Sequence, residues 1–428
     1  MPGVRSRLEP LLSDRSLDLG PDADLYPQAF GQCMAKKKGI TTVDGFGLGL
    51  DYLIVDRKTL VPLPPASVGG SGKDVIWSIN EARTGIRLCT AVPEKSVSAA
   101  ADRLSADLPA LSALVEDLMD GMLLPTGAHP LATTDDFQNS GPGANADGLN
   151  GFFADEGMQW TSSSRVELPF ADEQAFGRSH TAIRMVLPII PAISASSPFF
   201  HGQRSGGLSA RILRALDGTQ PLPELTGAYI PEVALDQADY YRIVLEPIAR
   251  ALADRGLADA VDYQLANRRA AIPSFERSVI TITVADTQEC VSSDAAVAEM
   301  MITVINAMTD GRWVSNYLQR AWHETDLGSI LKDVARQGGE AVIANRDYLL
   351  MFGMMRESAT AAELWRHLYQ QLRSELSEAA RIRIAHILDH GCLAQRILRR
   401  TGDRPSRERI LEVYRELATC LRENAIFN

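Results

Sequence analysis

The strongest constraint on the fold comes from two segments in which apolar residues alternate with small or polar ones. Residues 45–56 divide their side chains between two faces: Leu48, Leu50, Tyr52 and Ile54 against Gly49, Asp51, Leu53 and Val55. Residues 278–286 divide theirs in the same way: Ile280, Ile282 and Val284 against Thr281, Thr283 and Ala285. A period of two indicates a β-strand with one packed face. The second face of the first strand then meets either a cleft or covering helices.

Several longer segments carry the period of an amphipathic helix instead. In residues 97–122 the large apolar side chains recur at intervals of four, three, four, three and four: Leu104, Leu108, Leu111, Val115, Leu118 and Met122. We expect this helix to cover the sheet. Further helices are predicted over residues 173–193, over residues 240–253, and from a cap at Ser293 or Asp294 to Met308. Shorter strands at 85–90 and 165–170 complete a mixed α/β pattern.

Composition divides the chain into three parts. We interpret residues 1–40 as an N-terminal extension that lies over the core, and residues 41–311 as the core itself. Residues 312–428 read as helical, with turn signals at 338–339, 358 and 401–405, and we expect a helical C-terminal subdomain packed on the core. Residues 125–151 are rich in glycine, proline, asparagine and aspartate, and a loop of this length in a compact domain is often functional.

Charge, apolar runs and cysteines limit the classes of partner. The formal net charge of -11 opposes binding to a nucleic-acid backbone, and the only basic run is residues 36–38. The longest apolar run, residues 185–193, contains two prolines and is far shorter than the roughly 20 residues that span a bilayer. No apolar stretch follows the first arginines, so no secretory signal is indicated. Five widely spaced cysteines without a C-x-x-C pair indicate reduced thiols in a cytoplasmic protein.

Two glycine-rich strings imitate nucleotide-binding loops without the required context. The three glycines of residues 45–49 (GFGLG) alternate within the predicted strand, and no helix follows to hold a phosphate at its N-terminus. Residues 69–73 (GGSGK) have Ser67 where a phosphate loop has its first glycine, and Asp74 where it has a magnesium-binding hydroxyl. A strand and a flexible loop account for these strings better than a nucleotide site does.

The histidines do not complete a metal or nucleophile site. His386 and His390 lie one helical turn apart with Cys392 close behind, a spacing that can present two ligands on one helix face. No carboxylate or further cysteine completes the set, so a half-exposed helix face is the better interpretation. His129, before Pro130 in the glycine-rich loop, is more suggestive, but no catalytic partner for it is apparent in the sequence.

Six strings span most of the chain: residues 46–52 (FGLGLDY), 77–93, 127–130 (GAHP), 168–170 (LPF), 188–202 and 278–290. Within them, residues 195–202 (ASSPFFHG), followed by Arg211, look like a loop after a central helix, and residues 286–290 (DTQEC) look like a strand exit. In content, order and spacing, these strings resemble the bacterial glutamate-cysteine ligase family, in particular its branch of about this length.

The resemblance implies a fold, cofactors and a reaction. The implied fold is a glutamine synthetase-like funnel of mostly antiparallel strands covered by helices, with the site on the concave face. The implied cofactors are ATP and magnesium. In the implied reaction, ATP phosphorylates a substrate carboxylate and an amine then attacks the acyl phosphate, while magnesium neutralises the phosphates. Such chemistry needs carboxylates around the metal ions.

On the first two strands, most of the carboxylates that the family carries are replaced. Where the family pattern has glutamates on its first strand, this sequence has Gly49 and Asp51, and the glutamate of the second strand corresponds to Arg87. Glu81 is acidic, but it lies well before the matching position. An arginine in this place would repel a magnesium ion.

The later strands depart from the family pattern in the same direction. The histidine of the third strand falls on Arg165, with Glu167 two residues later, and the Glu-x-Arg pair of the late strand falls on two threonines. The resemblance therefore implies a candidate ligand-binding funnel with no intact metal site and with catalytic residues unassigned. Its residues are Asp51, Arg87, Arg165, Glu167, Arg211, Thr281 and Thr283.

Three functions stay open at this point. The first is a non-catalytic or repurposed paralogue that partners an active subunit or binds an anionic, amino-acid-like metabolite through Arg87 and Arg165. A simpler role for the same arginines is to pair with Asp51 and Glu167 in a buried polar funnel. The second function is an active ATP- and magnesium-dependent ligase that joins an amino-acid carboxylate to an amine. The third is a metal-free enzyme in which the arginines clamp a carboxylate. A protein partner or a homo-oligomer is compatible with the helical C-terminus.

Overall fold

The computed structural model describes residues 45–63, 70–71, 75–79, 85–133, 136, 160–217, 222–258, 263–402 and 404–428. Several predictions fall elsewhere in the chain: the extension over residues 1–40, most of the 125–151 loop, most of the glycine-rich string at 69–73, and Glu81. These lie outside the described residues.

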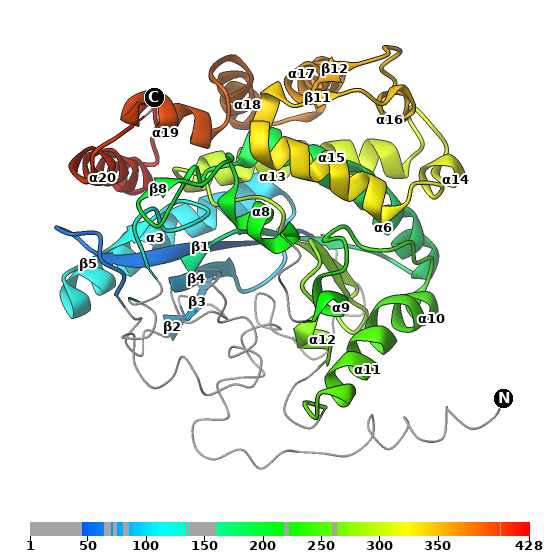
Figure 1. The fold of residues 1–428 in the computed structure, drawn as a ribbon, viewed down its shortest axis with the longest axis horizontal. Helices are drawn as coiled ribbons and strands as arrows, with labels where there is room; N and C mark the ends of the chain where they lie inside the picture. Colours follow the sequence, from blue (N-terminus) through cyan, green and yellow to red (C-terminus); the bar gives the residue numbers. More distant parts are fainter. Residues whose placement is uncertain are drawn as a thin grey trace.

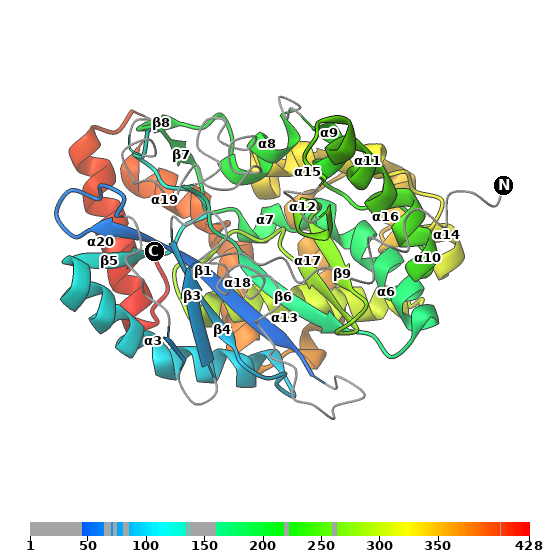
Figure 2. The ribbon, with the colours of Figure 1, turned by 90° about the horizontal axis from the view of Figure 1, so that it is seen from below.

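In the described part of the chain, an antiparallel sheet of eight strands forms the centre of the fold, and β1 (Gly47–Asp56) is its middle strand. On one side β1 pairs with β4 (Gly85–Thr90), and on the other it pairs with β6 (Ser164–Pro169) and β5 (Gly121–Leu124). Beyond β4 lie β3 (Val75–Ile79) and β2 (Gly70–Ser71), and beyond β6 lie β10 (Val279–Ile282) and β9 (Ala271–Ser274). Figure 2 shows β3, β1 and β6 crossing the molecule in this arrangement.

The alternation of β1 separates two apolar layers, as the sequence predicts. Leu48, Leu50 and Tyr52 are buried in the main core, where α3 (Val97–Met119) and α13 (Val291–Thr309) pack against the sheet. Each such side chain stabilises the fold by about 1.5–3 kcal/mol. By length and composition α13 could cross a membrane, but 78% of its apolar window is buried inside the protein, as expected for a core helix.

The second face of β1 is covered at one end by the C-terminal helices. Leu53 and Val55 belong to a separate apolar cluster with residues of α19 (Leu393–Thr401) and α20 (Arg407–Glu423). Figure 1 shows these two helices at one end of the sheet, above β5. The polar residues of the same face lie toward the other end of β1.

The helix predicted over residues 97–122 ends earlier than its apolar period suggests. It stops at Met119, and Met122 lies in strand β5. Asp120 adopts the left-handed conformation (φ 49°), and its N–H donates to the carbonyl of Glu116. This conformation ends the helix and turns the chain back onto β1. The prediction was therefore wrong for the last three residues.

Prolines break the helix predicted over residues 173–193. Asp172 caps α6 (Glu173–Val186) by accepting a hydrogen bond from the N–H of Ala175. The chain then continues as a 3-10 turn (Leu187–Ile189) and a separate short helix, α7 (Pro191–Ser194), because Pro188 and Pro191 have no N–H to donate.

Boundaries of three more elements differ from prediction. Strand β6 covers residues 164–169 rather than 165–170. Strand β10 ends at Ile282 rather than at residue 286. Helix α13 begins at Val291 with Cys290 in the capping position, so Ser293 and Asp294 lie in its first turn rather than at its cap.

The remaining elements lie mainly on the main-core side of the sheet or beside it. The helix predicted at 240–253 corresponds to α10 (Gln237–Tyr240), a π-helical segment (Tyr241–Leu245) and α11 (Glu246–Asp254).

Other helices before α13 are α8 (Ala210–Leu216), α9 (Pro223–Thr226) and α12 (Tyr263–Ala266), with the hairpin β7 (Phe199–Phe200) and β8 (Gln203–Arg204). After α13 come α14 (Asn316–Gln319), α15 (Glu324–Gln337), the 3-10 turn Gly338–Glu340, α16 (Arg346–Met351), α17 (Ala361–Leu372), the 3-10 turn Arg373–Glu375 and α18 (Glu378–His390). Within this helical part, β11 (Val342–Ile343) and β12 (Ala359–Thr360), on either side of α16, pair as a short antiparallel sheet that was not predicted.

Candidate functional site

Strand register gathers five of the predicted site residues on one face of the sheet. Asp51 of β1 lies opposite Arg87 of β4, and Gly49 lies opposite Arg165 of β6. Gly47 lies opposite Glu167, which in turn lies opposite Thr281 of β10. Directly opposed residues of antiparallel strands point to the same face. The polar row is therefore Asp51, Arg87, Arg165, Glu167 and Thr281, while Ile280 and Ile282 point into the core as their phase predicts.

At one end of this row, Asp51 and Arg87 form a buried bidentate ion pair. The Arg87 Nε donates to Asp51 Oδ1 at 2.6 Å and a terminal nitrogen donates to Oδ2 at 3.0 Å. The side chains of Arg87 and Asp51 are only 2% and 5% exposed. Arg165 adds a longer contact, with its Nε 3.5 Å from Asp51 Oδ2. Both carboxylate oxygens are thus engaged by guanidinium groups.

At the other end, Glu167 pairs with an arginine that the sequence analysis missed. Arg277, in the turn between β9 and β10, donates to Glu167 Oε1 at 2.9 Å. A side chain at position 47 would put its Cβ 2.9 Å from Glu167 Oε2, so Gly47 leaves space for the carboxylate to lie across β1. No strand was predicted at residues 271–274, and the hairpin that carries Arg277 therefore went unrecognised.

A magnesium ion does not fit these residues. Glu167 lies opposite Gly47, which is four residues from Asp51 along β1. The carboxylates of Asp51 and Glu167 are therefore attached to backbone positions about 14 Å apart along the strand direction. Each already faces a guanidinium, and magnesium needs several oxygen ligands in one small octahedral shell. Among the described residues, no group of three or more His, Cys, Asp or Glu side chains is arranged to hold a metal ion.

The two other predicted site residues are engaged away from this polar row. Thr283 lies just past the end of β10 and its hydroxyl donates to the Ala270 carbonyl at 3.4 Å. Arg211, from α8, is buried and donates from Nε to Asp286 Oδ1 at 2.8 Å. Its terminal nitrogens donate to the Val284 carbonyl at 2.7 Å and to the Tyr229 hydroxyl at 3.1 Å. The contacts of Arg211 are those of a structural residue.

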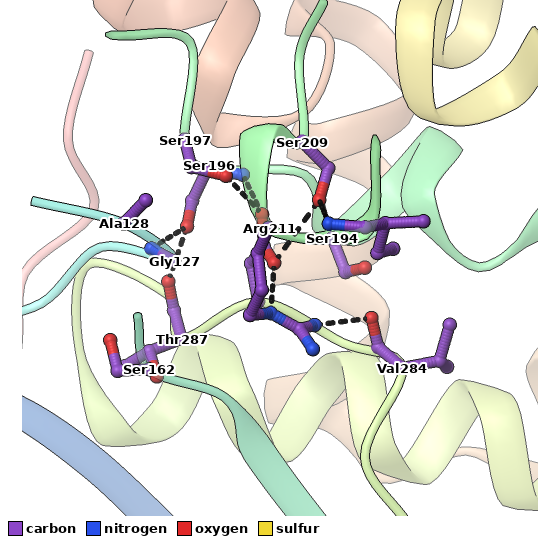
Figure 3. Close-up of polar contacts among 12 residues, drawn as sticks. Gly127, Ala128, Ser162, Ser194, Ser196, Ser197, Ser209, Arg211, Val284 and Thr287 are labelled. Atoms are coloured by element: carbon purple, nitrogen blue, oxygen red, sulfur yellow. Dashed lines mark hydrogen bonds and ion pairs between the residues drawn. The ribbon is translucent and has the colours of Figure 1, made fainter. Parts of the chain in front are cut away.

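Asp286 is the centre of a second polar cluster, and Figure 3 shows its partners Ser196, Ser197, Ser209 and Arg211 in close-up. The residue is 1% exposed, and its carboxylate accepts four hydrogen bonds from described residues. Oδ2 accepts from the Ser196 N–H at 3.0 Å and from the Ser197 hydroxyl at 2.9 Å. Oδ1 accepts from the Ser209 hydroxyl at 3.2 Å and from Arg211. Hydrogen bonds from this set of donors stabilise the negative charge of a buried carboxylate.

Three of the strings that carry the family resemblance meet at this cluster. The Gly127 N–H donates to the Ser196 hydroxyl at 2.7 Å, and that hydroxyl donates to the Thr287 carbonyl at 2.7 Å. The Thr287 hydroxyl donates in turn to the backbone carbonyl of Asp51 at 2.9 Å. The strings GAHP, ASSPFFHG and DTQEC therefore act together to position β1, and through it the polar row.

His129, His386 and His390, which were considered from the sequence as possible site residues, have defined surroundings in the structure. His129 is buried; its Nε2 donates to the Leu60 carbonyl at 2.9 Å, and its Nδ1 accepts from the N–H groups of Leu131 and Ala132 at 3.0 and 2.8 Å. Burial is the main cause that lowers the pKa of His129 to about 4, so the ring is neutral and holds a turn. His386 and His390 lie with their ring centres 4.5 Å apart.

Comparisons with known proteins agree with this architecture. Glutamate-cysteine ligase family 2 matches residues 81–416 of the chain. An uncharacterized protein of Archaeoglobus fulgidus is 26% identical over 321 residues, which cover 73% of this chain and 80% of that protein.

Two solved structures share the fold. The glutamate-cysteine ligase of Francisella tularensis, solved in complex with AMP, is 14% identical with a TM-score of 0.57 and 88% of each chain covered. A bifunctional glutathione synthetase of Pasteurella multocida is 12% identical with a TM-score of 0.54, and the match covers 89% of this chain and 52% of that one. The predicted glutamine synthetase-like class, with antiparallel strands covered by helices, is confirmed. Because the family match extends over most of its length, the chain belongs to glutamate-cysteine ligase family 2.

Proposed function

We propose that this chain is a repurposed member of its family that binds a small carboxylate-bearing ligand at the polar row instead of running the magnesium-ATP reaction. The observation that carries the proposal is the bidentate pairing of Asp51 with Arg87. This pair uses both oxygens of the one acidic residue that remains on β1 at the family's metal-ligand positions. Removing that arginine from a buried carboxylate to admit a metal would cost several kcal/mol.

The charge balance of the row favours an anion over a cation. Its described charged groups are the arginines 87, 165 and 277 and the carboxylates of Asp51 and Glu167, so three positive charges face two negative ones. Among these described groups, positive charges therefore outnumber negative charges. Guanidinium groups bind carboxylates with matched, bidentate geometry, so such a surface suits a ligand that carries a carboxylate.

Arg165 and Arg277 are better placed to meet a ligand than Arg87. The side chain of Arg87 is only 2% exposed, whereas those of Arg165 and Arg277 are 16% and 14% exposed. Arg277 donates to Glu167 through one terminal nitrogen, and a guanidinium carries five N–H donors. We therefore assign ligand recognition to Arg165 and Arg277, and assign to Arg87 the neutralisation of Asp51.

The test compares binding and turnover in the same preparation. Phosphate release from ATP is measured with magnesium and a panel of amino acids, and binding of the same amino acids and of dicarboxylates is measured by calorimetry without metal. We expect no phosphate release above the protein-free blank, together with metal-independent binding that Arg165→Gln and Arg277→Gln each weaken by about tenfold or more. Arg373→Gln, at an exposed arginine whose side chain makes no hydrogen bond or ion pair among the described residues, is the matched control.

The competing function is the ligase reaction of the family, and AMP bound to the Francisella tularensis enzyme makes nucleotide binding its first expectation. Amino-acid-dependent phosphate release that disappears in Asp51→Asn would establish that reaction and overturn our proposal. Binding of carboxylates that is unaffected by both arginine variants would also contradict it.

A further inference from the structure

A cavity of about 400 Å³ opens within the helical layer, away from the polar row. Its floor includes Ala192 and Ile193 of α7 and Leu388 of α18, and no residue of the polar row lines it. Small-molecule sites in proteins have volumes of roughly 300–1,000 Å³ and combine apolar walls with a few polar groups. The size and the lining of this cavity therefore suit a small ligand.

Two arginines face the cavity and are held in place from the same side. Arg366 of α17 donates to the carbonyl of Leu388 at 2.6 Å, and Arg399 of α19 donates to the carbonyl of His390. Both carbonyls belong to the last turn of α18, which leaves such groups without helical partners. Each arginine uses one terminal nitrogen in this way and keeps further N–H donors for a ligand.

Two carboxylates line the same cavity. Glu340 belongs to the 3-10 turn that follows α15, and Asp389 lies near the end of α18. Within the described parts of the chain, neither carboxylate pairs with Arg366 or Arg399, and no other ion pair involves any of the four. Two positive and two negative residues, all four of them exposed to solvent, thus line one open pocket without forming ion pairs with one another.

We propose that this cavity binds a free α-amino acid. A zwitterion presents a carboxylate to Arg366 and Arg399 and an ammonium group to Glu340 and Asp389, which a simple anion or a simple cation would not do. The apolar floor then contacts the side chain of the ligand. The site is separate from the polar row, so its occupation is independent of the function proposed there.

The test is calorimetric titration of the full chain with free α-amino acids, with their N-acetyl derivatives and with their amides. We expect at least one free amino acid to bind, and its N-acetyl and amide forms to bind about tenfold more weakly or worse, because each lacks one of the two charges. Arg366→Gln and Glu340→Gln should each weaken binding of the free amino acid by a similar factor. The Glu340 side chain makes no hydrogen bond or ion pair among the described residues, so Glu340→Gln should fold normally.

Two control variants separate this site from the rest of the molecule. Arg373→Gln removes an exposed positive charge outside the cavity and should leave all binding unchanged. The double variant Arg165→Gln with Arg277→Gln alters the polar row and should remove only the binding assigned to that row, so amino-acid binding at the cavity persists in it. The proposal is overturned if this double variant binds no free amino acid, if the binding that remains in it survives both Arg366→Gln and Glu340→Gln, or if the blocked derivatives bind there as well as the free forms.

Discussion

Removing Arg87 should destabilise the protein strongly, because Asp51 would then be a buried carboxylate without its main partner. The two side chains are 2% and 5% exposed and share hydrogen bonds of 2.6 and 3.0 Å. Breaking a buried ion pair from one side costs about 3–5 kcal/mol. Unfolding entropy scales as roughly 2.1 cal/mol/K per residue, which gives about 0.9 kcal/mol/K for 428 residues. Arg87→Met should therefore lower the thermal midpoint by about 3–6 °C.

The assay is thermal unfolding followed by the fluorescence of the five tryptophans. Arg312→Met is the matched control, because it removes an arginine from an exposed pair with Glu375 whose side chains are 40% and 47% exposed. That change should cost less than about 1 kcal/mol. The double variant Asp51→Asn with Arg87→Met should lose clearly less than the sum of the single variants, because the two groups act as a unit. If Arg87→Met melts within 1 °C of the wild type, the pair is not buried and our account of the polar row fails.

Three further predictions concern other parts of the fold. Burial lowers the pKa of His129 from 6.5 to about 4, so on acidification the unfolded chain binds the proton first. The free energy of unfolding should therefore fall by up to about 3 kcal/mol as the pH drops from about 6.5 to about 4. The unfolding free energies of wild type and His129→Gln, measured by chemical denaturation, should converge over this pH range, and parallel pH profiles would contradict the prediction. In Gly127→Ala the new Cβ would lie 2.3 Å from Asp286 Cγ. We expect the free energy of unfolding, measured by chemical denaturation, to fall by about 1–3 kcal/mol. An unchanged denaturation midpoint would refute this close approach. Arg396→Met leaves Glu289 buried without its arginine partner and removes the hydrogen bond to the Phe427 carbonyl. It should lower the free energy of unfolding by about 3–5 kcal/mol and speed proteolytic trimming of the C-terminus. Protease resistance equal to that of wild type would refute this prediction.

The strands and their phase could be predicted from the sequence because burial imposes a period of two. The core positions of Leu50 and Ile280 follow directly from that period, and so does the placement of Asp51 and Thr281 on the opposite face. The end of helix α3 could not be predicted in this way. Its apolar period continues to Met122, and only the left-handed backbone at Asp120 ends the helix.

The side-chain partners in the site depend on contacts between distant segments. The pairing of acidic residues with arginines was anticipated, but the partner of Glu167 is Arg277, which lies 110 residues away in an unpredicted hairpin. Asp286 likewise meets Ser196 across 90 residues. Local patterns carry no information on such pairings. The family was identified correctly, but the main role of the strings GAHP, ASSPFFHG and DTQEC in the fold, to position β1, emerges only when they are seen together.

The most direct test of the central claim is calorimetric titration of the folded protein with a non-hydrolysable ATP analogue, with and without magnesium. If guanidinium groups already neutralise the carboxylates of the polar row, as we describe, magnesium will not promote nucleotide binding. Magnesium-dependent binding of the analogue that Asp51→Asn abolishes would contradict this account, because it would mean that Asp51 leaves Arg87 to hold the metal.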